Sequence, residues 1–294
     1  MSRVSNRVAT DGNRLALFRD ALTSEELKTA PPYALRDLTL SDATTNFNAD
    51  GSFHLVMYPP NPAACASHVQ QTGKVSCEKF KQDTCTIFDK YFKTTTKTSP
   101  RTFIESGGFD GTPEWSMTEL MERQGWEGLV VEATPGNYVQ LAEHRPCVSL
   151  VESAASPVWG PVEFFGWGGC CSGIKDAMSD KFIETFHGKE KSKIVSYNVR
   201  SAPIVELIKA WGKTEVDFWV LDVEGAEKFV LMGMDFEQVK VGMIMIEISE
   251  QAETAREADD MLVQAGFFKS TTFQSWNNLN ALYLNKGVYG EHND

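Results

Sequence analysis

Short apolar runs alternate with amphipathic stretches from about residue 100 to near the end of the 294-residue chain. This alternation is typical of parallel strands joined by crossover helices that cover the sheet. The strands expected from the apolar runs are Thr102–Glu105, Gly128–Ala133, Cys147–Ser153, Val216–Asp222 and Val241–Ile248. The helices expected between and after them are Pro113–Gln124, Pro135–Glu143, Ala202–Trp211, Ala226–Met232 and Glu253–Ala265. Two late strands, Lys269–Phe273 and Ala281–Asn285, are expected to form an antiparallel hairpin at one edge. The pattern therefore predicts an α/β, Rossmann-like fold with a mostly parallel sheet, helices on both faces and an antiparallel edge hairpin.

The first hundred residues have a different character, because prolines interrupt them and a Thr-rich stretch ends them. Within them, Phe53–Tyr58 alternates as a short strand does, and Cys77–Phe92 has the apolar spacing of an amphipathic helix. We expect residues 1–98 to form an N-terminal extension that packs on a main domain of residues 99–294. An independent small domain is the alternative.

Composition narrows the classes of function. The formal net charge is −12, and the basic residues are scattered, which argues against a broad phosphate-binding face and hence against nucleic acid as a partner. No apolar run approaches the roughly 18 residues that a membrane helix needs. A protein that natively began at Met1 would be expected in the cytoplasm, whereas removal of an N-terminal anchor would allow a secretory lumen.

The six cysteines have no zinc-ribbon spacing. Cys65, Cys77 and Cys85 form a loose cluster that could pair in an oxidising compartment, and buried thiols are the alternative. The adjacent Cys170 and Cys171 are too close for an ordinary disulfide.

A glycine-rich turn follows the first strand of the main domain. An acid stands at the end of the strand and another within the turn: Glu105, Gly107, Gly108, Asp110 and Gly111. Such a turn brings the backbone close to a ligand at the carboxyl end of the strand. The spacing is not G-x-G-x-x-G, and the two acids would repel a pyrophosphate but attract a ligand that carries sulfonium and ammonium groups. The next strand ends in Glu132, whose carboxylate could accept hydrogen bonds from both hydroxyls of a ribose. The simpler alternative is that the glycines form an ordinary loop and that Glu132 is a surface acid.

A second acidic group follows the apolar strand that ends at Leu221. Strand alternation places Asp222 and Glu224 on one face at the carboxyl end of this strand, whereas Glu227 fits a helix N-terminus. Asp222, with Glu224, is the candidate to orient an acceptor or to take its proton. These acids could instead hold a divalent metal. We favour a site without metal, because the sequence identifies no further convergent carboxylate or amide.

Between Pro157 and Lys193 the chain is rich in aromatic residues and glycine, which suits a flexible wall over a substrate pocket. A rigid flap of packed aromatic residues is the alternative. His187 is the candidate second base in this region, and a surface histidine is the alternative.

From Glu105 to Gly111, and again from Leu221 to Glu227, the chain resembles the FkbM-type family of class I S-adenosylmethionine (SAM)-dependent methyltransferases. The resemblance extends over about two-thirds of the chain and includes further segments at Ser116 and Thr118, Gly125-Trp126, Val131 to Pro135, Arg145-Pro146, Ser153 to Ala155, Val216 to Phe218, and Glu247. It implies a cofactor site that includes Ser153, Ala154 and Asp222. Phe109 and Ala133 depart from the family, which often has Asn and Pro there.

The resemblance implies a SAM-dependent methyltransferase that methylates a hydroxyl oxygen of a small molecule or glycan. A catalytically silent SAM-fold binding module is the first alternative, although retention of Glu105, Glu132 and Asp222 argues against it. A nicotinamide-dependent oxidoreductase is a further alternative, but it needs a phosphate-binding glycine spacing that the sequence lacks.

Overall fold

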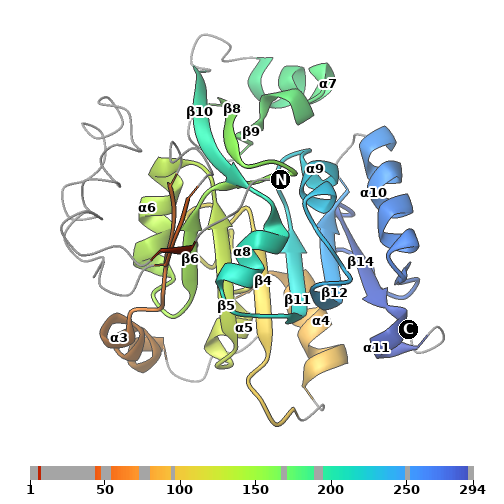
Figure 1. Ribbon diagram of the computed structural model, residues 1–294. Helices are drawn as coiled ribbons and strands as arrows, with labels where there is room; N and C mark the ends of the chain where they lie inside the picture. The colour runs from red at the N-terminus through yellow and green to blue at the C-terminus, as the bar shows by residue number, and fades with distance from the viewer. Residues whose placement is uncertain are drawn as a thin grey trace.

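Five parallel strands form the centre of a mixed sheet in the computed structural model, which describes residues 6–7, 44–47, 54–72, 80–93, 97–166, 171–188, 195–248 and 252–290. The strand order is β1-β2-β3-β6-β5-β4-β11-β12-β14-β13 (Figure 1). The parallel strands are β6 (Ser149–Glu152), β5 (Glu127–Glu132), β4 (Thr102–Ser106), β11 (Glu215–Leu221) and β12 (Lys240–Glu247). These are the five strands that the apolar runs predict.

Antiparallel strands extend the sheet at both edges. On one side β14 (Asn280–Asn285) pairs with β12 and with β13 (Phe267–Lys269), which confirms the predicted antiparallel edge. The predicted bounds Lys269–Phe273 were wrong, since β13 begins at Phe267 and ends at Lys269. The strand ends there because the Ser270 hydroxyl accepts a hydrogen bond from the Phe273 backbone and turns the chain. On the other side, β3 (His54–Tyr58) pairs with β6, followed by β2 (Thr44–Phe47) and β1 (Asn6–Arg7).

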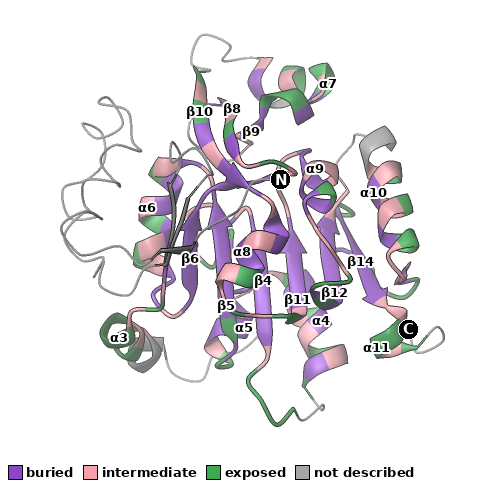
Figure 2. Cartoon of the chain, viewed as in Figure 1, coloured by how far each residue is buried: buried purple, intermediate pink, exposed green. Residues whose placement is uncertain are grey.

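Both faces of the central sheet are buried (Figure 2). Successive residues of a strand point to opposite faces, so Ile104 and Phe103 belong to separate apolar clusters. The Ile104 face is covered by α8 (Ile204–Ala210), α9 (Glu227–Met232) and α10 (Ala252–Gln264). The Phe103 face is covered by α4 (Gln82–Ile87), α5 (Glu119–Arg123) and α6 (Pro135–His144). Helices on both faces, together with the parallel strands, make the fold Rossmann-like, as predicted.

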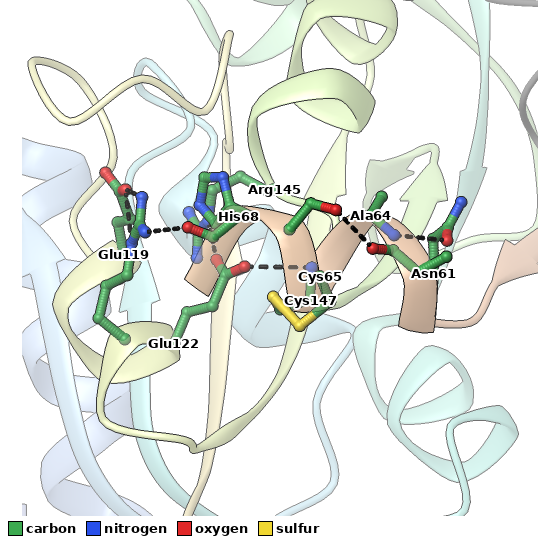
Figure 3. The surroundings of a disulfide bond; sticks show 11 residues. Asn61, Ala64, Cys65, His68, Glu119, Glu122, Arg145 and Cys147 are labelled. Carbon is green, nitrogen blue, oxygen red and sulfur yellow. Dashed lines mark hydrogen bonds and ion pairs between the residues drawn. A yellow bond between two sulfur atoms is a disulfide. The ribbon is translucent and has the colours of Figure 1, made fainter. Parts of the chain in front are cut away.

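The described part of residues 1–98 contacts the sheet at several points. Strand β3 adds to its edge, and the π-helical turn η3 (Phe88–Phe92) continues α4, so that Ile87 and Phe92 join the core on the Phe103 face. Helix α3 (Pro62–Thr72) is linked by a disulfide between Cys65 and Cys147, just before β6 (Figure 3). We therefore keep the proposal that residues 1–98 are an extension of the main domain.

The disulfide corrects the expected cysteine pairing. Cys65 pairs with Cys147, which lies outside the cluster of Cys65, Cys77 and Cys85. Cys85 is also disulfide-bonded, and Cys77 lies outside the described residues. Sequence spacing missed the Cys65–Cys147 bond because the two residues are 82 positions apart and meet only when α3 packs beside the loop that precedes β6.

Removing this disulfide should destabilise the fold. The double variant Cys65→Ser with Cys147→Ser should lose about 2–5 kcal/mol of unfolding free energy, because the bond closes a long loop in the unfolded chain. Urea denaturation of both proteins under identical conditions measures the difference. Equal midpoints and slopes would contradict the expectation.

A second, four-stranded sheet lies at the carboxyl ends of the parallel strands. Its order is β7-β10-β8-β9, and β7 (Ala154–Ala155) follows directly after β6. The other strands are β8 (Gly160–Gly166), β9 (Gly173–Ile174) and β10 (Val195–Ala202). Figure 1 shows β8, β9 and β10 together with α7 (Asp180–Phe182) above one end of the central sheet. The segment expected to form a wall thus includes regular β structure that the sequence pattern did not predict.

The remaining short elements are η4 (Lys175–Ala177), η5 (Ile183–His187) and α11 (Lys286–Tyr289). Among the described residues, no helix combines the length and apolar character that a membrane-spanning segment requires.

Candidate functional site

A cavity of about 490 Å³ lies across the carboxyl ends of the parallel strands. It runs from the end of β6 past β5, β4, β11 and β12 to the beginning of β14, and is lined in that order by Ser153, Glu132, Ser106, Asp222, Glu247 and Asn280. Its volume is in the range of small-molecule sites. Open α/β sheets bind their ligands at this position, so the cavity is the candidate functional site.

The turn after β4 approaches β11 so closely that only glycine fits at its first position. Gly107 has φ +88°, and a Cβ atom there would lie 1.7 Å from the backbone oxygen of Asp222. Gly107 lines the cavity, so it stays a candidate cofactor-binding residue. The described lining residues do not include Gly108, Asp110 or Gly111. Asp110 instead accepts hydrogen bonds from the backbone and hydroxyl of Thr112, so these positions shape the turn.

Glu105 lies beneath the turn, in a network of buried polar groups. Its carboxylate accepts hydrogen bonds from Arg145, from the Met117 backbone and from the hydroxyls of Ser116 and Thr118. It is 2% exposed and is not among the described residues that line the cavity. This arrangement differs from the expectation that Glu105 faces a cationic ligand, because its carboxylate is directed toward Arg145 beneath the turn.

The same network explains why α5 is shorter than predicted. The helix was expected to begin at Pro113, but it begins at Glu119. The backbone and hydroxyl groups of residues 116–118 are directed to Glu105 instead of an earlier helical turn. A buried carboxylate therefore organises the loop between β4 and α5.

Glu132 stands at the end of β5 and lines the cavity. Its Oε2 accepts from the Phe109 backbone at 2.9 Å, and its Oε1 accepts from the Thr134 backbone at 2.7 Å. The Asn137 amide also approaches Oε1, at 3.5 Å. Burial raises the pKa of Glu132 to about 7, although these hydrogen bonds act to lower it. Glu132 thus joins the glycine-rich turn to the cavity wall.

The raised pKa of Glu132 predicts a pH-dependent contribution to stability. Because the ordinary value is 4.5 and the folded value is about 7, this contribution is fully present below pH 4.5 and is lost as pH rises to about 7. In Glu132→Gln the dependence disappears, so the melting temperature of the variant relative to the parent should rise between pH 4.5 and 7 and then level off. Thermal melts across this range measure the difference, and Glu237→Gln on an exposed turn is the control. A flat difference for Glu132→Gln would contradict the assignment.

Four carboxylates gather where β11 and β12 end. Asp222 and Glu224, the predicted catalytic acids, both line the cavity together with Glu247 from β12. Burial raises the pKa of Asp222 to about 6, and burial together with Asp222 raises that of Glu224 to about 8. Burial, and then Asp222 and Glu224, raise the pKa of Glu247 to about 10. Glu227 accepts hydrogen bonds from the Val223 and Gly225 backbone, as its place at the N-terminus of α9 predicts.

Three of these acids lie close enough together to bind one divalent cation. Carboxylate oxygens of Asp222, Glu227 and Glu247 all lie within 4.8 Å of one another. The sequence places Glu227 near Asp222 but does not indicate that Glu247 joins them. Their convergence keeps the metal alternative open, whereas burial, together with the charge of the neighbouring carboxyl groups, explains the raised pKa values without a metal.

Ser153 and Ala154, the remaining predicted cofactor residues, line the cavity at the end of β6. His187 does not: it is fully buried, and its Nε2 lies 2.9 Å from the backbone oxygen of Cys171. The ring also packs against Phe165 and Phe182. His187 is therefore placed within the packing of the second sheet, and this geometry does not support a role as second base.

A model of the methyltransferase FkbM domain matches residues 105–269, which is more than half of the chain. The chain belongs to the FkbM methyltransferase family. The match runs from the residue at the end of β4 to the end of β13, and it confirms the resemblance found in the sequence. The protein is thus a methyltransferase.

Among solved structures, the chain is similar to a human methyltransferase 10 domain containing protein, with 10% identity and a TM-score of 0.36. The similarity covers 77% of this chain and 83% of that chain. The delta-N METTL16 MTase domain has 10% identity and a TM-score of 0.31, with 76% of this chain and 82% of that chain covered. No curated protein matches the chain at a significant level.

The structure of this FkbM methyltransferase also reveals lining residues that sequence reasoning missed. They come from segments far apart in the sequence, and the last three lie at the β14 end of the cavity: Lys81, Trp115, Asn277, Leu279 and Asn280. No motif marks them, and they meet only in the folded chain.

Proposed function

We propose that this FkbM methyltransferase uses SAM as its methyl donor and methylates a hydroxyl oxygen of a small molecule or glycan. The observation that carries the proposal is the position of Glu132, whose carboxylate lies in the cavity beside the glycine-rich turn. Family membership supports methyl transfer, and the acceptor class follows from the family resemblance.

The residues present fit SAM. Each oxygen of Glu132 has one close backbone donor, at 2.9 and 2.7 Å, and can accept a further hydrogen bond from a ribose hydroxyl. The titratable residues described along the cavity are four carboxyl groups and one lysine: Glu132, Asp222, Glu224, Glu247 and Lys81. Asp222, with a pKa of about 6, is mostly ionised at neutral pH, and a nearby cation favours the ionised form of the other carboxyl groups. The lining therefore favours a ligand with sulfonium and ammonium groups over a pyrophosphate. Ser153 and Ala154 at the end of β6 would lie beyond the ribose in the same cavity.

SAM supplies a methyl group on a positively charged sulfur, and its transfer is an in-line displacement for which positioning provides much of the rate. Asp222 lies near the middle of the cavity, between the end of β4 and the end of β12. Its raised pKa of about 6 leaves the carboxylate mostly ionised at neutral pH and makes it a stronger base than an exposed aspartate. We assign Asp222 to orient the acceptor hydroxyl and to accept its proton.

Asp222→Asn tests this assignment. The side chain keeps its size but can no longer take a proton, so turnover should fall about 10²–10⁴-fold while affinity for S-adenosylhomocysteine changes much less. Transfer of tritium from methyl-labelled SAM to a mixture of hydroxylated small molecules and glycans measures turnover, and calorimetry measures affinity.

The control is Asp260→Asn, which changes an exposed acid on α10. Unchanged turnover in Asp222→Asn would remove the assignment, and loss of parent activity on chelation would favour the metal alternative.

A further inference from the structure

The β14 end of the cavity has a wall made of three separate segments, which we call the outer wall. Lys81 precedes α4, Trp115 lies in the loop after β4, and Asn277, Leu279 and Asn280 belong to the loop that leads into β14. Asn277, Leu279 and Asn280 lie at the β14 end, and Lys81 lies close enough to Asp222 to lower its pKa, whereas Ser153 lies at the other end, after β6. Trp115 joins this wall to the glycine-rich turn, because its ring contacts both Lys81 and Phe109. Most of the outer wall therefore lies away from the proposed ribose site at Glu132.

Two adjacent buried residues of α4 hold the outer wall together. Asp83 accepts hydrogen bonds from the Ser275 hydroxyl at 2.7 Å, the Trp276 backbone at 3.0 Å and the Asn280 amide at 2.9 Å. Thr84 donates from its hydroxyl to the Met117 backbone oxygen at 2.6 Å. Both side chains are 1% exposed. A helix of the N-terminal segment thus connects the loop before β14 with the loop after β4.

The chemistry of the outer wall indicates its ligand. The Trp115 indole is 52% exposed, makes a T-shaped contact with Phe109 and has the Lys81 ammonium over one face, 5.2 Å from its ring centre. Lys81 over this face disfavours a cation, and Asp222, mostly ionised at the base of the cavity, disfavours an anion. A flat indole surrounded by amide, ammonium and carboxylate groups suits a ring with an apolar face and several hydroxyls.

We infer that the outer wall is the acceptor subsite, that it takes a neutral polyhydroxylated ring against Trp115, and that Asp83 is its positioning residue. This inference rests on the proposed function, because the acceptor must lie next to bound SAM. It also gives α4 a role in the site, as the element that fixes the distance between the two loops.

Calorimetry with methyl β-D-glucopyranoside tests the inference, in the presence of saturating S-adenosylhomocysteine. The parent protein should bind the glucoside, and Trp115→Ala should weaken that binding at least tenfold. Asp83→Asn should weaken it about fivefold or more, while the affinity for S-adenosylhomocysteine stays within twofold of the parent. Ser275→Ala, which removes one of the three donors to Asp83, should cause a smaller loss in the same direction.

Matched controls separate this role from general effects. Trp276→Ala removes an exposed indole that is not among the described lining residues, and Asp89→Asn changes an exposed acid on η3; both should bind the glucoside like the parent. Glucose 6-phosphate and glucosamine should both bind more weakly than the glucoside.

The outcomes distinguish two failures. Absence of glucoside binding to a parent that binds S-adenosylhomocysteine would overturn only the acceptor subsite, as would parent-like glucoside binding by Trp115→Ala or by both Asp83→Asn and Ser275→Ala. Tighter binding of the phosphate or the amine would overturn the neutral ring. Failure of the parent to bind S-adenosylhomocysteine would overturn the proposed function itself.

Discussion

Replacing Arg145 by alanine is expected to lower the free energy of unfolding by about 3–5 kcal/mol, because it would leave buried carboxylates without their cation. Arg145 is fully buried and forms ion pairs with Glu105 at 3.1 Å and with Glu122. Its guanidinium also donates to Thr118 at 3.1 Å. Burial alone would lower the pKa of Arg145, but Glu122 and Glu105 hold it above its ordinary value. Urea denaturation measures the loss.

The loss of stability should also affect the region around the Cys65–Cys147 disulfide, because Arg145 and Glu122 lie beside it (Figure 3). Glu122 also accepts a hydrogen bond from the Cys147 backbone. Arg145→Lys keeps a positive charge but loses the multiple donors, so its stability should lie between those of the parent and Arg145→Ala. Lys209→Ala, which removes an exposed pair with Glu206, should leave the midpoint nearly unchanged. Equal stability of Arg145→Ala and the parent would show that Glu105 is not held as described.

Glu132→Ala should raise the dissociation constant for S-adenosylhomocysteine about 10–100-fold, the equivalent of about 1.5–3 kcal/mol for hydrogen bonds to a charged group. The physical reason is that the proposed ribose hydroxyls lose their carboxylate, while Phe109 and Thr134 lose an acceptor that fixes the turn. Isothermal titration calorimetry measures the constant.

Glu127→Ala is the matched control, because Glu127 lies at the opposite, exposed end of the same strand. Its affinity for S-adenosylhomocysteine should equal that of the parent. If Glu132→Ala also bound with parental affinity, the ribose assignment would be wrong, and the site of the cofactor would have to be sought elsewhere in the cavity.

The central sheet could be predicted because its strands are buried on both faces and are separated by helices of regular apolar spacing. The position of Glu132 follows from the same pattern. Ser106 pairs with Val131, so the residues that follow them, Gly107 and Glu132, come together at the carboxyl ends of β4 and β5. The pairing of Leu221 with Ile246 brings Asp222 beside Glu247 in the same way, but this becomes visible only when strand order is known.

Contacts between distant segments could not be predicted from local pattern. Glu105 was expected to face the ligand, because nothing in its own strand indicates that Arg145 packs against it from beyond α6. The two-residue strands β7 and β9 are too short to show an alternation. Asp83 likewise gives no signal of its role in its own helix, since its partners lie more than 190 residues away.

The most direct test of the central claim is a thermal shift of the parent protein with S-adenosylhomocysteine and, separately, with NADH. A ligand that binds only the folded state adds about 2.7 kcal/mol of stability at a hundredfold excess over its dissociation constant. We expect a higher melting temperature with S-adenosylhomocysteine and little change with NADH. A larger shift with NADH, or no shift with S-adenosylhomocysteine, would contradict it.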